Sequence, residues 1–122
     1  MLNVGAFIYN LLTTSSALTA LVSSSNILSS YPDAITIFPS VIFSDEQRDI
    51  EFVDELPTAS NSDVTIHVYV RDDTPYTISN VVCNLMKSIY WSCVSNVDSP
   101  DPDTAVRHRV MRFTRPLLTG DI

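Results

Sequence analysis

Apolar and polar residues alternate most regularly between residues 64 and 71. Val64, Ile66, Val68 and Val70 fall on one face of an extended chain, and Thr65, His67, Tyr69 and Arg71 fall on the other. Side chains of a β-strand point to opposite faces with a period of two. The segment is therefore predicted to be a strand with one buried face.

Two other segments have helical periodicity. Apolar residues at 4, 7, 8, 11 and 12 form one stripe of an N-terminal helix, which Asn3 can cap, and Ser16 can cap a short second helical turn. After Asp72, Asp73 and Thr74, Pro75 fits the first position of a long helix that is predicted to reach about Asn96. Trp91 breaks the apolar stripe of this helix and falls on its polar side.

The remaining elements are less regular. Short strands are expected around residues 35–43 and 50–53, and a strand with two mixed faces over 105–113, whereas residues 56–63 and 98–103 have the composition of loops. No repeat or domain boundary is visible, so residues 1–122 are expected to form one domain. The element order predicts an α+β fold, with a small, mainly antiparallel sheet of about four strands and the N-terminal and long helices packed on one face.

Composition and charge exclude several classes of protein. The 122 residues contain 14 acidic and seven basic side chains, for a net charge of −7, which argues against phosphate binding. Only two glycines occur, so neither common glycine-rich phosphate loop is present. No secretory leader or membrane-spanning run is visible, and no membrane association is expected.

The residues that could support catalysis do not follow the spacing of a catalytic or metal-binding motif. His67 and His108 lack a metal-ligand motif, and the pair Asp49 and Glu51 is typical of solvated acids. Cys83 and Cys93, if both lie in the long helix, would be about 15 Å apart along its axis, too far for a disulfide. They are therefore expected to be two reduced thiols of an intracellular protein. The chain is predicted not to be an enzyme and to need no metal or cofactor.

Surface features are more informative. An exposed tryptophan on a polar helix face is typical of protein interfaces, so Trp91, with Lys87 on the same side, is a candidate contact. Charge is also segregated, because residues 1–106 have a net charge of −10 and residues 107–122 have +3. The C-terminal arginines could form ion pairs within the monomer, or meet acids of a neighbouring subunit in a ring. The candidates are Arg107, Arg109 and Arg112.

Three segments together resemble the tail-terminator, or tail-to-head joining, proteins of long-tailed phages. They are VGAFIYNLLTTSSALTALV near the N-terminus, PSVIFSD in the middle, and the strand–turn–helix unit SDVTIHVYVRDDTPYTISNVVCNLMKSIYW. The resemblance covers most of the chain in layout, except that Ser23–Ser25 replace the glycine usual after the second short helix. The family has no invariant catalytic motif, so the resemblance transfers no site residue.

The resemblance implies a non-enzymatic virion protein. Such proteins form a ring, typically of six copies, that caps the tail tube and docks to the head connector, and DNA passes through the ring. The implied locations are the tail end or neck of the virion and, during assembly, the host cytoplasm. The alternatives are a head-completion protein of the phage neck and a small non-enzymatic adaptor.

An acidic channel would suit this role, because basic residues would bind the phosphates of passing DNA. The segment from residue 45 to 55, or the loop at 98–103, is therefore expected to face the channel. The channel candidates of the first segment are Asp45, Glu46, Asp49, Glu51, Asp54 and Glu55.

Overall fold

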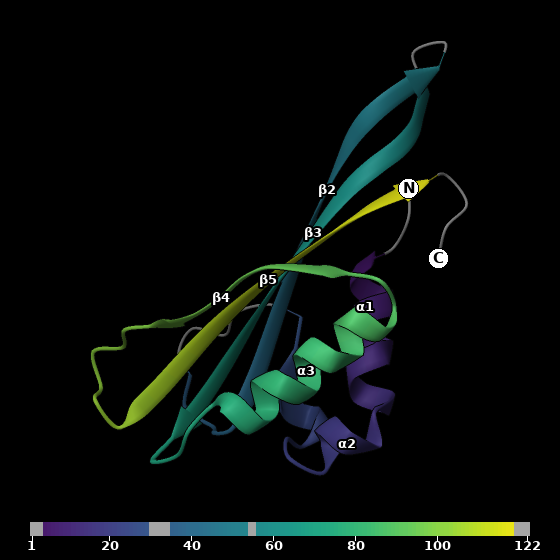
Figure 1. The fold of residues 1–122 in the computed structure, drawn as a ribbon. Coiled ribbons are helices and arrows are strands. Elements are labelled where there is room, and N and C mark those ends of the chain that lie inside the picture. Colours follow the sequence, from purple (N-terminus) through teal and green to yellow (C-terminus); the bar gives the residue numbers. More distant parts are fainter. Residues whose placement is uncertain (1–3, 30–34, 54–55, 119–122) are drawn as a thin grey trace.

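The computed structural model describes residues 4–29, 35–53 and 56–118. A five-stranded sheet is covered on one face by helices (Figure 1). The elements are α1 (Val4–Thr14), α2 (Ser16–Thr19), the 3₁₀ turn η1 (Ser24–Asn26), β1 (Ile27–Leu28), β2 (Ser40–Val53), β3 (Leu56–Arg71), α3 (Tyr76–Ser88), β4 (Ser92–Ser99) and β5 (Val106–Leu118). The α+β prediction is confirmed, with five strands in the described residues where about four were expected.

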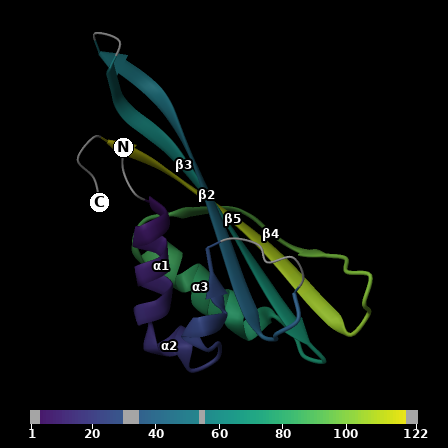
Figure 2. The same ribbon diagram turned by 180° about the vertical axis from the view of Figure 1, so that it is seen from behind.

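The sheet order is β1-β2-β3-β5-β4. β1 pairs in parallel with β2, and the other three pairings are antiparallel. The two long central strands, β2 and β3, continue beyond the layer of helices as a projecting hairpin (Figure 2). We call the distal part of this hairpin, residues 47–61, the arm.

The core lies between the helices and one face of the sheet. The strand predicted at 64–71 is confirmed, because Val64, Ile66, Val68 and Val70 are all buried in that core. The stripe of α1 is also confirmed, since Val4, Ile8 and Leu12 are buried. Ser15, one residue before the expected cap, is the N-cap of α2, and its hydroxyl accepts the N–H of Leu18 at 3.3 Å. Asn3 lies outside the described residues.

The two predicted loops are corrected by the pairing of strands. Residues 56–63 belong to β3, where β2 pairs on one side and, from Ala59 on, β5 pairs on the other. Ladder hydrogen bonds on two sides outweigh the turn-like composition of this segment. The second loop is shifted along the chain, because β4 extends to Ser99 and β5 begins at Val106, so the loop covers residues 100–105.

The long helix ends eight residues earlier than predicted. α3 stops at Ser88, and Tyr90 takes a left-handed conformation with φ of 68°. The N–H of Tyr90 donates to the carbonyl of Lys87 at 3.0 Å, and the N–H of Trp91 donates to the carbonyl of Met86 at 3.1 Å. These are the two hydrogen bonds of a Schellman C-cap, which usually has glycine at the left-handed position. The chain then reverses into β4. No helix among the described residues is long and apolar enough to cross a membrane.

Candidate functional site

Trp91 lies in the core, so the prediction that it is exposed on a polar helix face is wrong. Its side chain is only 2% exposed and is among the largest fully buried ones. The C-cap of α3 explains the error, because Trp91 follows the helix and turns beneath its last turn. The indole Nε1 makes no hydrogen bond to any part of the chain that the structure describes.

Other aromatic and apolar side chains are exposed near this turn. Tyr90 is 82% exposed and Val94, at the start of β4, is 62% exposed, while Lys87 is exposed on the last turn of α3. Sequence reasoning missed the two apolar residues because it placed both inside a helix. Strand-forming residues at 89–91 were the available signal that the helix ends earlier.

The three arginines of β5 differ in their surroundings. Arg109 is held within its own chain by Asp98, whose Oδ1 lies 2.9 Å from the guanidinium, and by Asn96, whose side-chain oxygen accepts from Nε at 2.7 Å. Its guanidinium also lies 5.2 Å from the ring centre of Tyr76. Arg107 and Arg112 are exposed. The sequence left open whether the C-terminal arginines form ion pairs within the monomer or with a neighbouring subunit. For Arg109 the structure shows an ion pair within the monomer.

The acidic candidates separate into two groups. In the loop region, Asp98 pairs with Arg109 and Asp103 pairs with Arg71 at 2.8 Å, which lowers the negative charge that this region presents. Asp45 and Glu46 are exposed at the base of the arm. Asp49 and Glu51 lie on β2 in the arm, on either side of an irregularity in the ladder. Asp54 and Glu55 lie outside the described residues.

The two histidines meet on the sheet face opposite the helices. Nδ1 of His67 lies 2.8 Å from Nε2 of His108, and the ring of Tyr69 stacks on His108 with a centroid distance of 4.0 Å. Burial, helped by His108 and Arg112, lowers the pKa of His67 to about 4. Burial also lowers the pKa of His108, although Asp101 acts in the opposite direction. The pair is therefore neutral at pH 7.

His67 and His108 are 41 positions apart in the sequence, and their spacing matches no metal-ligand motif. They meet because His108 is opposite Tyr69 in the β3–β5 register, which places it diagonal to His67. In the part of the chain that the structure describes, no group of three or more metal-ligating side chains occurs. The pair is consequently a hydrogen-bonded imidazole pair within the sheet.

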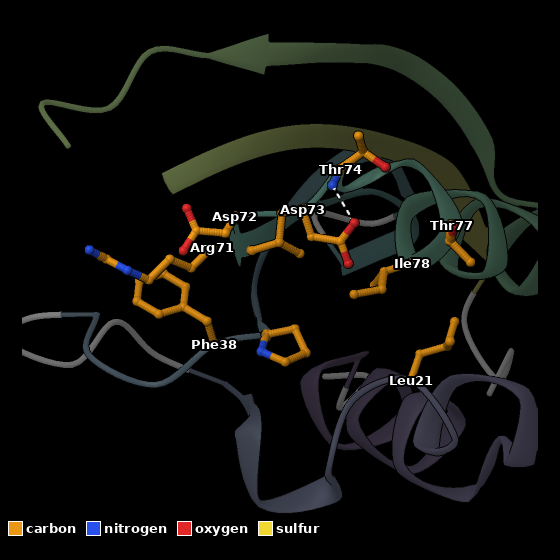
Figure 3. Close-up of a pocket in the computed structure, with 10 residues that line it drawn as sticks. Leu21, Phe38, Arg71, Asp72, Asp73, Thr74, Thr77 and Ile78 are labelled. Carbon is orange, nitrogen blue, oxygen red and sulfur yellow. Dashed lines mark hydrogen bonds between the residues drawn. The ribbon is translucent and has the colours of Figure 1, made fainter. Parts of the chain in front are cut away.

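A pocket of about 530 Å³ lies between the end of α2, the start of α3 and the β3–α3 turn (Figure 3). Its apolar wall includes Leu21 and Ile78, and its polar wall includes Asp72 and Asp73. The carboxylate of Asp73 forms a hydrogen bond within the turn, because its Oδ1 accepts the N–H of Thr74 at 2.7 Å. No Ser, Cys, Lys or His is among the described residues that line the pocket. The pocket thus lacks the usual pairing of a nucleophile with a histidine or lysine base.

Comparison with known proteins finds a similar fold. A chain in the structure described as "Virion of native gene transfer agent (GTA) particle" superposes with a TM-score of 0.69. The match covers 90% of each chain at 13% sequence identity. No family model matches the sequence. No curated protein matches it either.

Proposed function

We propose that this chain is a structural protein of a phage-like virion, and that it forms a ring capping the tail tube. In this role the ring joins the tube to the head connector and leaves a channel for DNA. The observation that carries the proposal is the fold shared, over 90% of both chains, with a component of a gene transfer agent virion. The resemblance of residues 4–22, 39–45 and 62–91 to phage tail-terminator proteins points in the same direction.

The arm supports assembly with other subunits. It continues beyond the helices, which leaves both faces of its strands without a helical cover (Figures 1 and 2). Strands of a small sheet need a packed face for stability, and an isolated hairpin is marginal in water. In a ring, the body of the adjacent copy would provide such a packing surface. We propose six copies, as in the proteins that the sequence resembles.

The distribution of charge supports a channel that does not hold DNA. Asp45 and Glu46 are exposed at the base of the arm, and four further acids follow before residue 56. Arg48 is the one basic residue in this stretch of sequence. Since DNA has a phosphate on every nucleotide, an acidic wall lets it pass without forming ion pairs. We therefore assign the segment from residue 45 to 55 to the channel wall.

Assembly on tail tubes tests the proposed role. The purified chain is mixed with preassembled tubes of the tail-tube protein from the same particle, and the tube ends are imaged by electron microscopy. We expect one ring at a tube end and no further tube growth. A variant with the arm shortened, in which residues 48–61 are replaced by an Asn-Gly turn that joins the paired positions Gln47 and Ser62, should fold but should not cap tubes.

Three outcomes would contradict the proposal. A chain that stays monomeric and ignores tubes would favour an adaptor. A chain that binds only isolated head connectors would favour a head-completion protein. Capping by the arm-shortened variant would contradict the role given to the arm. The matched control is the melting temperature of that variant, which should stay close to that of the original chain because the buried core residues that the structure describes pack between the helices and the rest of the sheet.

A further inference from the structure

The reversal after α3 brings its two cysteines close together. Cys83 lies five residues before the end of α3, which corresponds to about 7.5 Å of helix. β4 runs back along the helix (Figure 1), and Cys93 is its second residue, so the returning strand covers a similar length from the turn at Tyr90. The separation of about 15 Å expected for a continuous helix is therefore wrong.

Both thiols lie at the border between core and solvent. Each cysteine is half-buried and packs against the main hydrophobic cluster. The Sγ of Cys93 donates to the carbonyl of Ser95 at 3.4 Å. Burial and the adjacent thiol of Cys83 raise the pKa of Cys93, whereas the hydrogen bond to Ser95 and, more weakly, Lys87 act in the opposite direction. The two sulfur atoms are thus neighbours and are partly accessible to a small reagent.

We propose that Cys83 and Cys93 form a redox-sensitive pair that closes to an intrachain disulfide in oxidising surroundings. With oxidised glutathione as the oxidant, the thiolate of one cysteine attacks the glutathione disulfide. This step forms a mixed disulfide and releases one reduced glutathione. The second cysteine, after losing its proton, attacks the protein sulfur of the mixed disulfide and releases the second glutathione. Two protein thiols are oxidised and one glutathione disulfide is reduced, so electrons and protons balance.

The bond would close the segment that contains the C-cap of α3. This segment includes the left-handed Tyr90 and the buried Trp91. Closing a loop of about ten residues restricts the unfolded chain, and we expect the melting temperature to rise by roughly 5–10 °C. The inference concerns the isolated chain, so it can fail or succeed whether or not the chain forms rings.

Mass spectrometry of the unaltered chain tests the pair. The full chain is equilibrated in mixtures of reduced and oxidised glutathione, quenched with acid, alkylated and digested with trypsin under non-reducing conditions. Because Lys87 lies between the cysteines, trypsin separates the peptide 72–87 from the peptide 88–107. We expect these peptides to stay linked after oxidation and to separate on reduction. The intact chain should lose the mass of two hydrogen atoms and form no covalent link to a second chain.

Single variants provide the matched controls. Cys83→Ser and Cys93→Ser should each take up one glutathione, and oxidation should not raise their melting temperatures. The proposal is overturned by two alkylated thiols, or two glutathione adducts, throughout the range of mixtures in which ordinary protein dithiols oxidise. It is also overturned by disulfides that link one chain to another. The peptide result on the original chain decides the matter even where a serine variant fails to fold.

Discussion

At the scale of single residues, the turn at 89–91 determines how the second half of the chain is arranged. Trp91 is the largest fully buried side chain, and its indole N–H is buried without a partner among the described residues. Its packing therefore has to outweigh the cost of an unsatisfied donor.

Trp91→Ala should lower the free energy of unfolding by about 3–5 kcal/mol, because it leaves a large cavity in the core. Trp91→Phe keeps most of the apolar volume and removes the unsatisfied N–H, so its cost should be below about 2 kcal/mol. Denaturation in urea, followed by circular dichroism, measures both changes. An alanine variant as stable as the original chain would contradict the burial of Trp91.

Tyr90 has a bulky side chain in a backbone conformation that favours glycine. A left-handed conformation costs a non-glycine residue roughly 1–2 kcal/mol, and the ring of Tyr90 is 82% exposed, so little packing offsets this cost. Tyr90→Gly should raise the free energy of unfolding by about 0.5–1 kcal/mol, after the larger entropy of glycine in the unfolded chain is included. Tyr90→Ala is the matched control, since it removes the ring but keeps the strain. Equal stabilities of the two variants would argue against strain at Tyr90.

The histidine pair makes stability depend on pH. In the unfolded chain His67 binds a proton near pH 6.5, but in the folded chain its pKa is about 4, and the pKa of His108 is also lowered. Between these values the unfolded state binds more protons, so stability is complete above about pH 6.5 and falls as the pH drops toward 4. His67→Gln should flatten this part of the curve of unfolding free energy against pH. An unchanged slope in the glutamine variant would contradict the assignment.

At the scale of elements, the sequence predicts those parts of the fold that have strict periodicity. The strand at 64–71 and α1 each bury one regular face, and this regularity is visible without the structure. The sequence did not predict the second strand of the arm, because residues 56–63 have the composition of a loop. They form a strand through pairing with β2 and β5. The end of α3 was missed because its C-cap has tyrosine where glycine would have indicated a stop.

Strand register and the early end of α3 also explain why the sequence did not predict the histidine pair and the cysteine pair. The histidine pair depends on the register of β3 and β5, and the cysteine pair depends on the reversal after α3. Neither arrangement has a signal in residue spacing. The strand predicted at 105–113, in contrast, is confirmed within β5, where Met111 and Phe113 are buried in the core and His108 lies on the opposite face with His67.

At the scale of the whole molecule, the net charge of −7 conceals a division between an acidic body and a basic β5. The ion pairs Arg71–Asp103 and Arg109–Asp98 within the chain neutralise part of the negative charge of the body and part of the positive charge of β5. Arg107 and Arg112, which are exposed, are then the basic side chains best placed to contact acids of an adjacent copy.

A ring held by such contacts should depend on salt, and individual arginines should differ in their effects. The Debye length falls from about 10 Å at 0.1 M to about 3 Å at 1 M ionic strength, so higher salt should dissociate the ring in sedimentation experiments. Arg107→Glu and Arg112→Glu should each weaken assembly at low salt and leave the melting temperature nearly unchanged, because both side chains are exposed. Arg109→Gln is the matched control, as it should cost about 1 kcal/mol of monomer stability by removing hydrogen bonds within the chain. Rings that persist at low salt in both glutamate variants would exclude β5 from the subunit contact, and the arm would then have to provide that contact without the arginines.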